Sequence, residues 1–257
     1  MTDLEQAIAF SRAFDERRAE RIAPAPHGRA LLTPSLPLVR HRNHFSVDLG
    51  VDVSADEIIG EAEPIFVEAG LAHRKVTIDD ELGDRLAPAF RERGWKVEEL
   101  VVMPLRPRGA DVDTSSVEEV HPEELEPLWI QGMRSEIQDE EEIRQLVSAQ
   151  HGRRRGAQVK YFAARVDGEV ASYCELFLDG GTGQIESVMT LETFRNRGLA
   201  KAVVARARDE SVAAGSDVTF IVAAAEDWPK ELYRKLGFET AGSMWDFVLM
   251  PRHSIAG

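Results

Sequence analysis

Cysteine is nearly absent from this sequence, which has a single one, Cys174, among 257 residues. An internal disulfide and a metal cluster built on several cysteines are therefore excluded. Cys174 lies in the apolar run ASYCELFL, which predicts a small buried core residue. The seven histidines have no spacing typical of metal ligands, and the run Arg153–Arg155 is interpreted as a solvated turn. We expect no metal site.

Basic residues are also scarce, with 31 against 45 acidic ones and a formal net charge of −14. This deficit argues against general binding of nucleic acid or of an anionic membrane, since both require a positive surface. An acidic surface is compatible with a cationic substrate, and equally with solubility alone.

Long apolar runs are missing too, because no uninterrupted stretch of about 18 apolar residues occurs, and we expect no transmembrane helix. The N-terminal segment has neither the basic nor the apolar region of a signal peptide, and its spacing of apolar residues predicts an amphipathic helix. These features predict a cytoplasmic protein. The sequence does not determine the oligomeric state, and a homodimer stays open.

A change in composition divides the chain into two regions. Prolines, a glycine and a Thr-Ser-Ser run predict a linker over residues 107–116, between a region 1–106 and a domain 117–257. The first region alternates strand and helix signals, with Ser54 as the start of a helix that Pro64 interrupts. Residues 23–37 are rich in proline and lack periodicity, which predicts an irregular connection.

The second region predicts a meander of strands followed by a crossover. Two apolar runs flank Asp167-Gly168, a typical hairpin turn, and QIESVMT follows as a third strand. A helix over about 198–214 then joins Ile185–Thr190 to Val218–Ala223, which predicts parallel neighbours. The expected fold class is mixed α/β (α+β): a mostly antiparallel sheet with a central parallel βαβ crossover, plus a smaller α/β N-terminal region.

The turn before that helix carries the pattern Arg195-x-x-Gly198-x-Ala200. A helix N-terminus has unpaired N–H groups and partial positive charge, so a phosphate can bind where a glycine lets it approach the backbone. The pattern has neither the Gly-Lys-Ser/Thr of a nucleotide-triphosphate loop nor the three glycines of a dinucleotide fingerprint. The alternative is a solvated turn that happens to contain arginine.

This turn resembles the signature Q/R-x-x-G-x-G/A of the GNAT family, the acyl-CoA-dependent N-acetyltransferases. The segment ELYRKLGF, Glu231–Phe238, resembles the late helix-and-strand motif of the same family, in which a tyrosine precedes Leu-Gly-Phe. The order and separation of the two motifs agree with the family from about Val117 to Met250. The resemblance implies a GNAT fold that binds acetyl-CoA as its co-substrate.

The resemblance also implies roles for individual residues. Backbone groups of strand residues 188–190 would pair with the pantetheine arm, and the following turn, with its two arginines, would hold the pyrophosphate. The residues concerned are Val188, Met189, Thr190, Arg195, Asn196, Arg197, Gly198, Leu199, Ala200 and Lys201. Tyr233 would act as general acid toward the departing thiolate, since a phenol of pKa about 10 stays protonated at neutral pH. The alternative for Tyr233 is a ring that packs on the sheet.

The general base has several candidates. Glu186 is a carboxylate in an otherwise apolar strand, where burial would raise its pKa toward a useful range; alternatively it lies on the solvated side of that strand. Glu175 and Asp227 are the other candidates. Many family members have an asparagine near the end of the fifth strand, where this sequence has Glu226 and Asp227, which puts an asparagine contact to the cofactor in doubt.

The first region contains a faint copy of the second. RLAPAFRERGWKVEELVVM aligns with KELYRKLGFETAGSMWDFVLM, which places Phe90 opposite Tyr233. Because the first region has no Arg-x-x-Gly-x-Ala turn, and Phe90 has no hydroxyl, we expect a degenerate GNAT-like half without catalysis. The alternative is a chance likeness between two short helices.

The sequence therefore predicts an acetyl-CoA-dependent N-acetyltransferase, in which an amine of a small molecule or a protein attacks the thioester directly. The resemblance places the acidic segment 135–143 where the acceptor-gating helices of the family occur, where it could attract a cationic acceptor; the alternative is an exposed, charged helix face. The rival function is a non-catalytic acyl-CoA-binding sensor or interaction module, and transfer of a longer acyl group also stays open.

Overall fold

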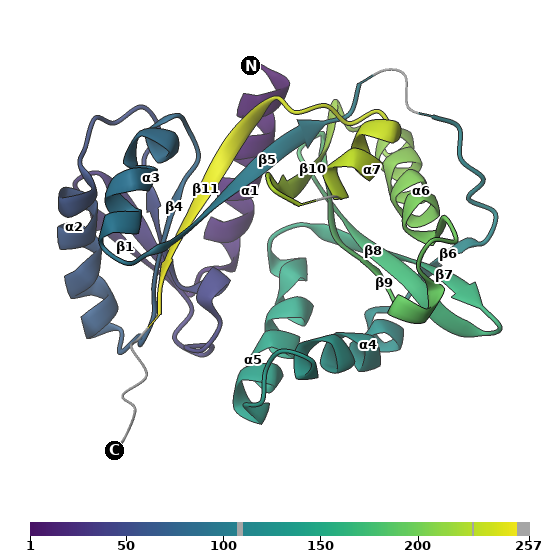
Figure 1. Ribbon diagram of the computed structural model, residues 1–257, viewed down its shortest axis with the longest axis horizontal. Coiled ribbons are helices and arrows are strands. Elements are labelled where there is room, and N and C mark those ends of the chain that lie inside the picture. Colours follow the sequence, from purple (N-terminus) through teal and green to yellow (C-terminus); the bar gives the residue numbers. More distant parts are fainter. Residues whose placement is uncertain (107–109, 228, 251–257) are drawn as a thin grey trace. The chain divides into compact units, whose positions relative to one another are not determined.

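The computed structural model in Figure 1 describes residues 1–106, 110–227 and 229–250. The chain divides into two compact units: a large unit of Met1–Phe14 with Val101–Gly242, and a small unit of Asp15–Leu100 with the chain from Ser243 onward. Helix α1 (Asp3–Arg18) and strand β5 (Lys96–Pro104) belong in part to each. Residues 107–109 of the predicted linker lie outside the described residues, and the predicted boundaries at 106 and 117 stay a prediction.

The small unit is built on strands in the order β1-β2-β3-β4-β11. Strands β1 to β3 are antiparallel, β3 and β4 are parallel and joined by α2, and β11 is antiparallel to β4. The bounds are β1 Arg21–Ala25, β2 Gly28–Leu32, η1 Arg40–Arg42, β3 His44–Val47, α2 Ala55–Glu68, β4 Arg74–Ile78, α3 Leu82–Glu92 and β11 Gly242–Leu249.

Two expectations for this unit are wrong. Residues 23–37 contain most of the β1–β2 hairpin rather than an irregular connection, and Pro24 is tolerated because β1 ends the strand order. Helix α2 continues through Pro64, which is exposed, so the carbonyl left without its helical donor can bind water. Its start at Ser54 is as predicted, with a capping box to Glu57.

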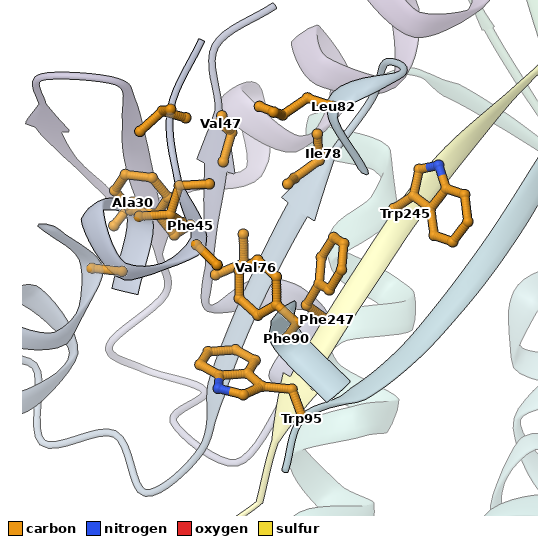
Figure 2. Packing of buried hydrophobic residues seen from close by; sticks show 14 of the residues in the cluster. Ala30, Phe45, Val47, Val76, Ile78, Leu82, Phe90, Trp95, Trp245 and Phe247 are labelled. Carbon is orange, nitrogen blue, oxygen red and sulfur yellow. The ribbon is translucent and has the colours of Figure 1, made fainter. Parts of the chain in front are cut away.

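The core of the small unit lies between its sheet and helices α2 and α3, and Figure 2 shows part of it. The Phe90 ring lies 5.1 Å from that of Trp95 and 4.3 Å from that of Phe247, measured between centroids. Phe247 and Trp245 come from β11, the last strand of the chain. Strand β11 follows the motif at Glu231–Phe238 in sequence, yet its side chains complete the core of the small unit.

The large unit confirms the predicted fold class. Its strands follow the order β5-β10-β9-β8-β7-β6, with β6 to β9 antiparallel and β9 parallel to β10 across helix α6. The hairpin at Asp167-Gly168 has positive φ at both residues, 52° and 85°, as its sequence predicts. The bounds are β6 Val117–Val120, α4 Pro122–Arg134, α5 Glu140–His151, η2 Gly152–Arg155, β7 Gln158–Val166, β8 Glu169–Asp179, β9 Thr182–Thr190, η3 Glu192–Phe194, α6 Leu199–Ala213, β10 Val218–Ala224 and α7 Pro229–Lys235.

The two faces of strand β8 have different surroundings in this unit. Cys174 is fully buried and its Sγ donates to the carbonyl of Val203 in α6, at 3.2 Å, which confirms the predicted core position. The next residue, Glu175, has the opposite side-chain direction and contacts Arg153 of η2. Helix α6 therefore lies on one face of the sheet, and the chain that follows α5 lies on the other (Figure 1).

Candidate functional site

The start of helix α6 forms an open backbone cradle. The first bond within the helix runs from the Ala202 N–H to the Gly198 carbonyl at 3.1 Å, so the N–H groups of residues 199–201 precede the helical bonding pattern. Asn196 and Gly198 both have left-handed backbones, with φ of 62° and 81°. The turn therefore needs residues tolerant of positive φ, and glycine and asparagine stand at those positions.

A cavity of about 400 Å³ lies against this cradle. It is lined by the end of β9, the turn, the first residues of α6, and helix α7: Val188, Met189, Thr190, Phe194, Arg195, Asn196, Gly198, Leu199, Ala200, Lys201, Pro229, Leu232 and Tyr233. Nine of the ten predicted cofactor-binding residues are in this lining. Arg197 is not, and its guanidinium carbon lies 5.3 Å from the centroid of the Phe194 ring.

A bulge in β9 opens the sheet beside the cavity. The β8–β9 register pairs Tyr173 with Met189 but Glu175 with Glu186, which leaves one extra residue in β9. Ser187, within the bulge, has a φ of 52°. The β9–β10 register ends at the pair Ile185–Ile221, just before the bulge. Residues 188–190 of β9 therefore lie beyond the part of the strand that pairs with β10, so their backbone can form a strand edge on that side.

Tyr233 is buried, with 7% of its surface exposed, and it lines the cavity from α7. The N–H groups of Leu236 and Phe238 donate to its carbonyl at 2.9 and 3.1 Å, so the Leu-Gly-Phe turn that ends α7 fixes its backbone. Burial, and then the negative charge of Glu186, raise the pKa of Tyr233 above its ordinary value. The phenol is therefore protonated at neutral pH and can donate.

Glu186 is half-buried on β9, directly opposite Glu175 of β8. Its Oε1 accepts a hydrogen bond from Nε2 of Gln184 at 2.6 Å. Burial raises the pKa of Glu186, and the charge of Glu175 adds to the rise, while the charge of Arg153 opposes it. Glu186 thus lies beside other ionised groups rather than on a plainly solvated face. Asp227, the third candidate, is exposed.

Arg153 corrects the interpretation of the arginine run as a solvated turn. Arg154 and Arg155 are exposed, but Arg153 keeps 15% of its side-chain surface and its Nη1 lies 2.6 Å from Oε2 of the fully buried Glu175. Sequence reasoning missed this pair. The signal was present in Glu175 itself, because a carboxylate within an apolar strand needs a cationic partner if it is buried.

The small unit repeats the backbone of the α7 motif. At the end of α3, the N–H groups of Arg93 and Trp95 donate to the Phe90 carbonyl, both at 3.1 Å, as those of Leu236 and Phe238 donate to Tyr233. Gly94 has a φ of 80° and Gly237 one of 95°. The alignment made from the sequence therefore corresponds to the same local structure.

The helix of the small unit that corresponds to α6 has no open cradle. At the start of α2, Oε2 of Glu57 accepts from the Ser54 N–H at 2.9 Å, and Oγ of Ser54 accepts from the Glu57 N–H at 3.3 Å. A carboxylate thus occupies the position where an anionic ligand would bind, and Asp52 lies beside it in a shallow depression. This chemistry opposes phosphate binding.

The described residues contain no group of three or more His, Cys, Asp or Glu side chains arranged to hold a metal ion. None of the helices among these residues has the length and apolar composition needed to cross a bilayer.

Comparison with known proteins agrees with this geometry. Residues 117–238 match the sequence model of a family described as "Acetyltransferase (GNAT) family". A search of curated proteins found no match.

Solved structures resemble the chain over both halves. A protein of unknown function from Staphylococcus epidermidis superimposes with a TM-score of 0.70 at 14% identity, over 91% of this chain and 94% of that one. A GCN5-related N-acetyltransferase from Kribbella flavida gives 0.66 at 15% identity, over 97% of each chain. A tandem GNAT protein from the clavulanic acid biosynthesis pathway gives 0.56 at 14% identity, over 89% of this chain and 80% of that one. At these identities the likeness establishes the fold.

Proposed function

We propose, from the match of residues 117–238 to the acetyltransferase (GNAT) family model and from the geometry of the site, that the chain is an acetyl-CoA-dependent N-acetyltransferase. Family membership supports acyltransferase activity with an acyl-CoA donor. An amine as the acceptor and acetyl as the transferred group are more specific than this match and belong to the proposal. The observation that carries it is the convergence on one cavity of the α6 cradle, the end of β9 and the Tyr233 side chain.

The cradle suits a pyrophosphate. The N–H groups of residues 199–201 point along the helix axis, where they can donate to phosphate oxygens, and the helix dipole favours negative charge there. Arg195 is exposed beside the cavity, and its contact with Glu192 is long, at 3.9 Å, so it can turn toward an anion. The backbone edge at residues 188–190 would pair with the amide groups of the pantetheine arm, as an added strand does.

The reaction then needs three proton transfers. Glu186 removes a proton from the acceptor ammonium, and the neutral nitrogen forms a bond to the thioester carbonyl carbon. As the carbon–sulfur bond breaks, the Tyr233 hydroxyl donates to the departing sulfur, and the nitrogen loses its second proton, which returns to the Tyr233 oxygen and completes the amide. The first two steps are linked, because burial and then the charge of Glu186 raise the pKa of Tyr233. Protonation of Glu186 removes that charge and makes the phenol a stronger acid when the thiolate forms.

A protein nucleophile is not required. Cys174 is fully buried, and burial raises the pKa of its thiol well above the ordinary value. A thiol without thiolate character is a poor nucleophile. Direct attack by the amine is therefore the step that the described residues of the site support best.

The first experiment is calorimetric titration of acetyl-CoA and CoA into the wild type and into Gly198→Trp. We expect micromolar binding to one site per chain in the wild type and its loss in the variant, because an indole at residue 198 would fill the cradle. Gly215→Trp is the matched control: Gly215 follows the other end of α6, also with a φ of 81° and with open space around it. Absence of binding to folded wild type would contradict the proposal.

A panel of amines, assayed with Tyr233→Phe alongside, then separates an enzyme from an acyl-CoA sensor. A sensor would bind the donor and acetylate no member of the panel. We propose a small-molecule or protein amine as acceptor, with which the acidic composition is compatible, and a cytoplasmic location. Binding of nucleic acid or membrane is not part of the proposal, and a homodimer remains a hypothesis for solution measurements.

A further inference from the structure

One register row of the large unit carries three ionisable side chains. Tyr161 of β7 pairs with Glu175 of β8, and Glu175 pairs with Glu186 of β9. Residues directly opposite in antiparallel strands project from the same face of the sheet. Two carboxylates therefore lie side by side, and one of them, Glu175, has no exposed surface.

Arg153 contacts this row from η2. Its Nη1 lies 2.6 Å from Oε2 of Glu175 and donates to Oγ of Ser187 at 2.8 Å. Its guanidinium carbon also lies 5.5 Å from the centroid of the Phe177 ring, two residues further along β8. Ser187 is the left-handed residue of the β9 bulge and directly follows Glu186. One side chain thus binds both the neighbour of Glu186 in sequence and its neighbour across the sheet.

The charges around Glu186 come from several elements. Burial raises the pKa of Glu186, the charge of Arg153 on η2 lowers it, and that of Glu175 on β8 raises it. Burial raises the pKa of Tyr233 on α7, and the charges of Glu186 and of Asp227, which precedes α7, add to the rise. Tyr161 and Tyr173 adjoin Glu175, and burial holds both phenols in the protonated form, with a pKa of about 12 for Tyr161. Two cations adjoin these groups: the guanidinium carbon of Arg154 lies 5.9 Å from the centroid of the Tyr161 ring, and Arg153 is the cation that acts on Glu186.

We propose that Arg153 is a positioning residue: by binding Glu175 and Ser187 together, it holds the β9 bulge and sets the proton affinity of Glu186. The inference rests on the proposed function, in which Glu186 is the general base. Without Arg153, two facing carboxylates would repel each other and hold a proton in common, as close carboxylate pairs do. A base that is already protonated cannot accept the proton of the acceptor ammonium.

The test measures protonation directly, without an acceptor. Glutamate labelled with carbon-13 at the side-chain carboxyl is followed by NMR against pH, and the signals of Glu175 and Glu186 are assigned by their loss in the Gln variants. In Arg153→Met, we expect the higher midpoint of the pair to rise by about one pH unit or more, because a cation that favours both ionised forms is gone. In Glu175→Gln, the midpoint of Glu186 should fall, because the like charge is gone and Arg153 remains.

Two further variants complete the set. Arg155→Met removes the same charge from an exposed residue of the same short helix and should leave both midpoints in place. Arg153→Lys keeps the charge and should restore the midpoint seen in the wild type. If Arg153→Met does not fold, the opposite shift in Glu175→Gln still tests the charge pairing.

The outcomes separate the two proposals. Unchanged midpoints in both folded Arg153→Met and Glu175→Gln would overturn the role of Arg153, whether or not the protein acetylates amines. Once an acceptor is known, the acid limb of kcat/KM should move with the NMR midpoint in each variant, which a merely structural role would not cause. Failure of acetyl-CoA to bind the wild type would instead overturn the proposed function, and the titration would still report the charge pairing.

Discussion

Replacement of Tyr233 by phenylalanine removes one hydroxyl and leaves the ring that packs in the core of the large unit. Burial raises the pKa of this phenol above 10, whereas an ordinary thiol has a pKa of about 8.5. Complete transfer of the proton to the sulfur is therefore uphill, and Tyr233 acts mainly as a hydrogen-bond donor to the developing thiolate. We expect kcat to fall about 10²-fold, the lower end of the range for general acids and equivalent to about 2.7 kcal/mol.

The assay follows release of CoA by a thiol reagent over pH 6 to 9.5, with saturating amine. In Tyr233→Phe, KM for acetyl-CoA should change by less than about threefold, since the hydroxyl contributes only as the carbon–sulfur bond breaks. The acid limb should stay in place, because it reports Glu186. A folded Tyr233→Phe protein with the kcat of the wild type would refute the reasoning. If kcat stayed unchanged and KM rose about 10²-fold instead, Tyr233 would be a binding residue.

Further predictions concern glycines and a buried histidine. Gly198→Ala and Gly215→Ala should each cost about 1 kcal/mol in urea unfolding, because both residues have a φ of 81°, but only Gly198→Ala should weaken acetyl-CoA binding in calorimetry. Gly83→Ala should lower the free energy of unfolding by about 1–3 kcal/mol, since the new Cβ would lie 2.2 Å from the Trp245 ring. Gly60→Ala, which adds a Cβ in open space on α2, should raise it by up to about 1 kcal/mol in the same measurement. Burial lowers the pKa of His44 to about 4 from 6.5, so the unfolded state binds the proton more tightly than the folded state. The free energy of unfolding should therefore keep its full value above pH 6.5 and fall by about 3 kcal/mol as the pH drops to 4. In His44→Gln, urea unfolding should show no such dependence on pH.

Local signals predicted much of the fold. The Asp167-Gly168 hairpin, the capping box at Ser54 and the crossover through α6 all follow from short-range chemistry, and the structure has each of them. The β1–β2 hairpin was missed because a buried strand without alternation, next to prolines, has no distinctive period. The pairing of β11 with β4 could not be predicted, because strand order depends on contacts far apart in sequence.

The candidate site was predictable where backbone chemistry defines it and not where side chains pair over distance. Glycine and asparagine at the α6 turn indicate positive φ from sequence alone, so the cradle could be located. The position of Glu186 could not, because the alternation of side chains along β9 is broken by the bulge at Ser187. Strand β7 and the first part of β8 lie between Arg153 and Glu175 in sequence, and no local pattern links the two residues.

The two halves share a backbone plan but differ in the charge at the helix start after the parallel strand. In the large unit the turn before α6 has arginines, a left-handed glycine and unbonded N–H groups, which together attract an anion. At the corresponding start of α2, the Glu57 carboxylate accepts a hydrogen bond from Ser54, so the charge that a ligand would bring is already present in the chain. Phe90 likewise keeps the helix-end geometry of Tyr233 without its hydroxyl. At both places the small unit has a contact within the fold where the large unit has a candidate ligand contact, which supports the proposal of a catalytic site in the large unit.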